Sequence, residues 1–198
     1  MKNRKEEIIR ATLELAAAKG LGAVSMQMIA DKVGITKASL YNHFSSRDEI
    51  VKAMYSFLRE ASKAKANVGA VDFDKMTQER SLQEILLGAV MSYRKIVEDP
   101  QMYLFYTVIM SERTINSAAA EIMVQETQTM INATKAIFYA LQVKGIASFP
   151  NVDAAALSFT MAVHAIIDHE NDLRSMKQKV NESMLQEYID EFCRMYEA

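Results

Sequence analysis

The chain has 198 residues, half of them apolar, with a net charge of −2 and a mean hydropathy of −0.06. Its sequence shows no apolar run of membrane-spanning length and no apolar segment of a secretion signal, and Cys193 as the single cysteine excludes an internal disulfide framework. We therefore expect a cytoplasmic protein without a membrane partner, and the two prolines, six glycines and 14 methionines favour an all-α fold.

The first predicted elements are a helix over residues 4–20 and two shorter helices after it. Ser25 is predicted to cap the second helix, and Gly34 to end it, because a left-handed glycine closes a helix at no steric cost. Thr36 is predicted to cap a short third helix, with its aromatic and polar side chains facing outward. Two helices separated by a short glycine turn are the sequence form of a helix-turn-helix.

A fourth helix is predicted over about 46–67, where Ser46 and Glu49 have the spacing of a capping box. The following stretch, residues 67–80, is predicted to be a loop between two parts of the chain. Five further helices are predicted over about 80–98, 100–113, 117–144, 152–175 and 179–197.

Two stretches near the N-terminus carry a family resemblance. They are IIRATLELAAAKG and SMQMIADKVGITKASLYNHFSSRDEI, in which glycine, capping residues and aromatics follow in order. They resemble the DNA-binding domain of the tetracycline-repressor (TetR/AcrR) family of bacterial transcription regulators. The resemblance implies a three-helix DNA-binding domain over 1–46 and a larger helical ligand-binding and dimerisation domain over 47–198. It also implies a homodimeric repressor that binds a palindromic double-stranded operator, without a cofactor.

The resemblance places the third helix in the major groove, which admits an α-helix and displays distinguishable base edges. Tyr41 and His43 match positions that commonly touch the DNA backbone, and Lys37 can reach a guanine or a phosphate. The expected DNA contacts are Ser25, Gln27, Thr36, Lys37, Ala38, Ser39, Tyr41, Asn42, His43 and Arg47. The alternative is that Tyr41 and His43 are ordinary surface side chains and that Arg47 pairs only with nearby acids such as Asp48.

The helices over about 80–170 are rich in methionine and aromatic residues, and segments 102–110 and 154–167 are apolar on nearly every face. Since these two segments hold no Lys or Arg, we expect a pocket for an apolar effector with little or no charge. The expected ligand contacts are Met102, Tyr103, Tyr106, Met110, Met130, Phe159 and His164. The polar groups suited to orienting hydrogen bonds are Tyr103, Tyr106, Thr107, Ser158, Thr160 and His164. The alternative is that these side chains only fill the core.

The last predicted helix carries a single apolar stripe, which consists of Leu185, Tyr188, Ile189 and Phe192. We expect this stripe and the apolar segment 152–167 to pair with their own copies in a four-helix dimer interface. Replacing Leu185 and Phe192 by arginine is then expected to give a monomer.

His164 and Asp168 lie four residues apart and share a helical face. Two groups are fewer than the three or four ligands of a zinc site, and the sequence shows no phosphate loop or nucleophile motif elsewhere. We therefore expect neither a metal site nor an enzyme. Two rival interpretations stay open: an enzyme that uses this pair, and a helical DNA-binding interaction protein without a small ligand.

Overall fold

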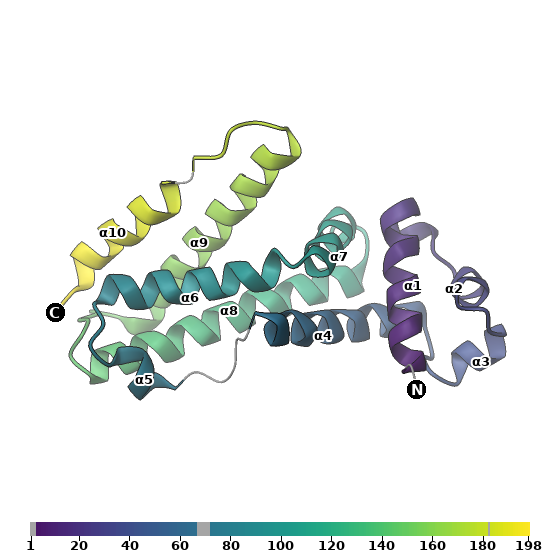
Figure 1. The fold of residues 1–198 in the computed structure, drawn as a ribbon, viewed down its shortest axis with the longest axis horizontal. Coiled ribbons are helices and arrows are strands. Elements are labelled where there is room, and N and C mark those ends of the chain that lie inside the picture. The colour runs from purple at the N-terminus through teal and green to yellow at the C-terminus, as the bar shows by residue number, and fades with distance from the viewer. Residues whose placement is uncertain (1–2, 67–71, 182) are drawn as a thin grey trace. The chain divides into compact units, whose positions relative to one another are not determined.

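The computed structural model describes residues 3–66, 72–181 and 183–198, and ten α-helices lie in these ranges (Figure 1). The chain forms two compact units, one from Met1–Gly69 with Arg94–Glu126 and the other from Ala70–Tyr93 with Thr127–Ala198. These units are structural groupings, and the functional division expected after residue 46 stays a prediction. Within the described ranges, no helix is long and apolar enough to cross a bilayer.

The first unit begins with α1 (Arg4–Lys19), the 3-10 turn η1 (Leu21–Ala23), α2 (Met26–Val33) and α3 (Lys37–Tyr41). Helices α2 and α3 begin and end at the capping residues and the glycine predicted from the sequence. The Ser25 hydroxyl accepts a hydrogen bond from the backbone N–H of Met28, and Thr36 does the same for the N–H of Ser39. Gly34 ends α2 in the left-handed region, with φ 75° and ψ 36°. The predicted helix-turn-helix is therefore confirmed at the level of its helices and caps.

The rest of the first unit includes α4 (Arg47–Lys65), α7 (Pro100–Glu112) and the first turns of α8 (Ser117–Val143). These helices share one core with α1–α3. Leu40 is fully buried in it and Phe44 is 3% exposed, so the five-residue α3 is anchored through two large apolar side chains. Because a helix this short is not stable alone, packing holds it in place.

A buried ion pair joins α4 to α8 inside the first unit. The Glu126 carboxylate, 1% exposed, accepts hydrogen bonds from the Arg59 guanidinium at 2.5 and 2.6 Å and from the Tyr55 hydroxyl at 2.5 Å. An exposed pair, Lys52 and Glu121, joins the same two helices at 2.7 Å. Because the two pairs join the same helices and differ in burial, they allow the effect of burial on an ion pair to be compared.

The second unit holds α5 (Phe73–Thr77), α9 (Val152–Ser175) and α10 (Met184–Tyr196), with most of α6 (Leu82–Val97) and the remainder of α8. Helix α5 corrects the loop expected over 67–80, because Asp72 caps it by accepting from the N–H of Lys75. The part of that expectation that falls on residues 67–71 lies outside the described residues.

The core of the second unit is built around phenylalanines from α8, α9, α10 and the segment between α8 and α9. Phe138 stacks on Phe149 with ring centroids 4.5 Å apart, and Phe159 meets Phe192 edge-on at 4.8 Å. Figure 1 shows α9 and α10 side by side, in keeping with their backbone contacts. The stripe of α10 thus lies inside the chain's own core.

This packing corrects the expected dimer residues. Leu185, Ile189 and Phe192 are 4%, 0% and 2% exposed, and Tyr188 packs partly buried against the same core. Their apolar surface is already covered by α8 and α9 of the same chain, so it is not open to a partner. Arginines at two of these positions are therefore expected to disrupt the second unit rather than separate two copies.

Candidate functional site

Helix α3 buries its apolar side and exposes its polar side. Tyr41 is 47% exposed although it is a large aromatic residue, and Lys37, four residues earlier on the helix, is exposed as well. Of the ten expected DNA contacts, Ser25, Gln27, Thr36, Lys37, Ala38, Tyr41 and Asn42 are exposed, and Ser39, His43 and Arg47 are partly buried. The structure therefore leaves the exposed seven accessible to a partner from outside.

The two capping hydroxyls keep a hydrogen-bond donor. Ser25 Oγ accepts from the N–H of Met28 at 3.2 Å, and Thr36 Oγ1 accepts from the N–H of Ser39 at 3.1 Å. A hydroxyl carries one proton and two acceptor lone pairs, so each O–H can still donate to a phosphate oxygen. The Gln27 side-chain amide donates one N–H to the Asp31 carboxylate at 2.7 Å and keeps its second N–H as a donor.

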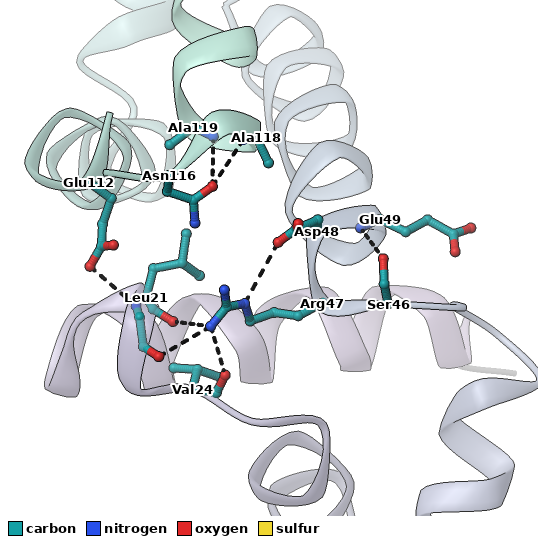
Figure 2. Close-up of polar contacts among 11 residues, drawn as sticks. Leu21, Val24, Ser46, Arg47, Asp48, Glu49, Glu112, Asn116, Ala118 and Ala119 are labelled. Carbon is teal, nitrogen blue, oxygen red and sulfur yellow. Dashed lines mark hydrogen bonds and ion pairs between the residues drawn. The ribbon is translucent and has the colours of Figure 1, made fainter. Parts of the chain in front are cut away.

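Arg47 is held by the turn between α1 and α2, as Figure 2 shows. Its Nη1 donates to the backbone carbonyls of Leu21 at 3.0 Å, Gly22 at 3.2 Å and Val24 at 3.2 Å. Its Nε lies 3.8 Å from the Asp48 carboxylate. On the other side of the turn, the N–H of Gly22 donates to Glu112 of α7 at 3.2 Å. The DNA contact expected for Arg47 stays a prediction. In this structure its guanidinium fixes the turn between α1 and α2 to the start of α4.

A short helix with a buried apolar side, an exposed basic and polar side, and a capped helix before it fits the major groove of duplex DNA. The two helices meet through a left-handed glycine, which keeps their connection short. These features define a helix-turn-helix DNA-binding protein.

Comparison with known proteins specifies the family. Residues 8–54 match the family model described as "Bacterial regulatory proteins, tetR family". Nucleoid occlusion factor SlmA from Vibrio vulnificus strain YJ016 is 34% identical over 79 residues, which cover 39% of this chain and 40% of that protein. The match thus spans less than half the length of this curated relative.

Two solved structures extend the likeness to the whole chain. The Flavonoid-responsive Regulator FrrA has a TM-score of 0.74 at 18% identity and covers 98% of this chain and 97% of its own. The SmeT–triclosan complex has a TM-score of 0.71 at 12% identity and covers 98% and 92%. At these identities the likeness shows a shared fold. The matched residues 8–54 identify an N-terminal domain of the tetR family of bacterial regulatory proteins.

The second unit holds an apolar cavity of about 100 Å³ between α6, α8 and α9. Two of the expected ligand contacts, Met130 and Phe159, line it. The other five do not: Met102, Tyr106 and Met110 pack in the core of the first unit, Tyr103 is 39% exposed, and His164 lies on α9 outside the lining.

Sequence reasoning missed the contribution of α6 and most of that of α8. Leu86, Val90 and Tyr93 face the cavity from α6, and Thr134 and Ile137 face it from α8. Both sets have the spacing of three or four residues that marks one helical face, so this signal was present in the sequence. It does not reveal which faces meet.

The remaining candidates for chemistry are sparse. His164 Nε2 lies 3.7 Å from the Asp168 carboxylate, and across the described ranges no group of three or more His, Cys, Asp or Glu residues could hold a metal ion. Cys193 is buried, and this burial, with Glu197 and Asp190 nearby, raises the pKa of its thiol to about 11. A thiol with this pKa is almost entirely protonated at neutral pH and is therefore a weak nucleophile.

Proposed function

We propose that the chain is a homodimeric repressor that binds a palindromic operator through α3 and releases it when an apolar small molecule enters the second unit. The observation that carries the DNA part is the exposed face of α3, with Lys37 and Tyr41 outward and Leu40 buried. Because a bacterial operator lies in the cytoplasm, we propose that the protein acts there. We propose no catalytic role for His164 and Asp168.

The ligand part of the proposal rests on the apolar cavity and on the fold. Two proteins of the same fold are described as flavonoid-responsive and as a triclosan complex, so this fold accommodates small-molecule ligands. A ligand can lower DNA affinity only if it binds the DNA-free conformation more tightly than the DNA-bound one.

The dimer part rests on the outer face of α9. Leu157 and Met161 are each 47% exposed and lie one turn apart on this face. Exposed apolar side chains in a row are typical of a surface that another molecule covers, and a two-fold axis lets the same face meet its own copy. The segment 152–167 expected for dimerisation thus keeps that role on its outer face, without the stripe of α10.

The alternative is a DNA-binding interaction protein without a small ligand. The curated relatives that support it are described as nucleoid occlusion factors, a description that mentions no small molecule. Operator binding with no compound-dependent release would favour this alternative.

The DNA part is tested by selecting duplex fragments with the purified protein and measuring their affinity for variants of α3. Replacing Lys37, Tyr41 or His43 by alanine should weaken operator binding about 5- to 150-fold wherever the side chain makes a strong interaction with a base. Lys95→Ala is the matched control, because it removes an exposed lysine on α6. Wild-type affinity in all three folded variants would overturn the assignment.

A further inference from the structure

The walls of the cavity in the second unit are almost entirely apolar. Leu86 and Val90 line it from α6, Phe138 from α8, and Phe159 and Val163 from α9, and all five are buried. The lining residues that the structure describes include no Asp, Glu, Lys, Arg or His. An ionised ligand would lose its hydration here without gaining an opposite charge, so the site selects for neutral molecules.

The size of the cavity limits the ligand to a single small ring. Its volume is about 100 Å³, whereas an apolar cavity of about 150 Å³ in another protein binds benzene and stays free of water. Ala133 on α8 is exposed and Ala89 on α6 is half-buried, so the small side chains of two alanines form its entrance. Because the cavity opens to the surface, a small substituent on the ring can extend out of it.

The polar groups of the lining are Tyr93 and two threonines that face each other across the cavity wall. Thr160 Oγ1 donates to Thr134 Oγ1 at 2.9 Å, which joins α9 to α8. Other helical threonines bond a carbonyl one turn back, such as Thr12 to Ile8 at 2.8 Å. Within the described ranges, this is the one hydrogen bond that the side-chain hydroxyls of Thr134 and Thr160 make.

A hydrogen bond between two hydroxyls uses one of their two protons. The second proton and the remaining lone pairs are therefore open to a ligand in the cavity that these residues line. A hydroxyl or carbonyl oxygen on the ligand would satisfy them, and an apolar environment strengthens such a bond.

We propose that this cavity binds a neutral, single-ring molecule with one hydroxyl or carbonyl oxygen, and that Thr134 and Thr160 orient that oxygen. The proposal names the ligand class for the cavity and so rests on the proposed small-molecule response. It also identifies two residues that decide which ring compounds bind.

The test uses three probes of one ring size on the full chain: 4-methylphenol, toluene and benzoate. The first two differ by one hydroxyl, and the third is anionic. We expect 4-methylphenol and toluene to bind in calorimetry or NMR titration, and benzoate to remain unbound. Tight benzoate binding, or no binding of either neutral ring, would overturn the proposal.

The residue assignment is tested with the double variant Thr134→Val, Thr160→Val, which keeps the side-chain shape and removes both hydroxyls. Its affinity for 4-methylphenol should fall about 3- to 10-fold relative to its affinity for toluene, since a net hydrogen bond is removed. An equal change for both probes would mean that the hydroxyls only support the fold, and it would reject their orienting role.

The place of binding is tested by filling the entrance with Ala89→Leu and Ala133→Leu, which should abolish binding of both neutral rings. Ala136→Leu is the matched control, because Ala136 is exposed on α8 outside the lining. Operator affinity is measured in parallel. Operator binding without ring binding overturns only the present inference, whereas ring binding without operator release supports it and rejects the proposed response.

Discussion

Two basic side chains near α3 have different surroundings although both were expected to contact DNA. Lys37 is exposed on the first turn of α3. Arg47 is partly buried, and its guanidinium donates to three backbone carbonyls of the turn between α1 and α2. The planar guanidinium can serve several acceptors at once, which an ammonium on a flexible chain does less well. We infer that Arg47 positions the helix-turn-helix and that Lys37 is the one available to phosphate or base.

This difference predicts that replacing Arg47 affects mainly the stability of the fold, whereas replacing Lys37 affects mainly the salt dependence of operator binding. Arg47→Ala should lower the free energy of unfolding by about 1.5–3 kcal/mol, the usual effect of losing hydrogen bonds to a charged group. Lys37→Ala should leave stability unchanged and reduce the salt slope of operator binding by about 1 if the lysine touches a phosphate. Denaturant titration and binding at several salt concentrations measure both. An Arg47→Ala protein with wild-type stability and a smaller salt slope would instead show a phosphate contact.

At the scale of elements, Gly34 connects α2 to α3 by virtue of its backbone alone. An added Cβ would meet nothing within 4 Å, but φ is 75°. Gly88 in the interior of α6 also has open space around its Cα, without a positive φ. The same substitution at the two glycines therefore separates backbone strain from steric crowding.

Alanine at these two positions should change stability in opposite directions. Gly34→Ala should destabilise by about 1–2 kcal/mol, because a left-handed conformation is unfavourable for a residue with a Cβ. Gly88→Ala should stabilise by about 0.5–1 kcal/mol, because alanine loses less conformational entropy in a helix interior. Urea unfolding measures both. A loss of stability at both sites would mean that crowding, and not the backbone conformation, governs them.

The two ion pairs between α4 and α8 give a second prediction at this scale. Glu126→Ala leaves the Arg59 charge buried without its partner, which should cost about 3–5 kcal/mol. Glu121→Ala removes an exposed partner of Lys52 and should cost less than about 1 kcal/mol. Thermal or urea unfolding compares them. Equal losses would contradict the burial of Glu126.

For the whole molecule, the apolar surface left uncovered on α9 is the feature that a second copy can use. The stripe of α10 is occupied inside the chain, whereas Leu157 and Met161 remain half exposed. A dimer through α9 would bury them, and a two-fold dimer that binds a palindromic duplex reads half-sites about 34–36 Å apart or a multiple of that.

Charges on this face should separate the copies. Leu157→Glu with Met161→Glu is expected to give a folded monomer in light scattering, with much weaker operator binding. Val124→Glu with Val143→Glu is the matched control, since it adds the same number of charges at two exposed positions on α8. A dimer that persists with the α9 charges would place the interface elsewhere.

The helix ends around α2, α3 and α4 could be predicted from local sequence, because a cap or a left-handed glycine acts on backbone groups only three to five residues away. Helix α5 was not predicted, because its five residues hold too few apolar positions to show a helical period. Three features became visible only in the folded chain: the α10 stripe faces inward, Arg47 bonds a turn more than twenty residues earlier, and three helix faces line a cavity. A period of three to four residues marks an apolar face, but which face it packs against depends on elements distant in the sequence.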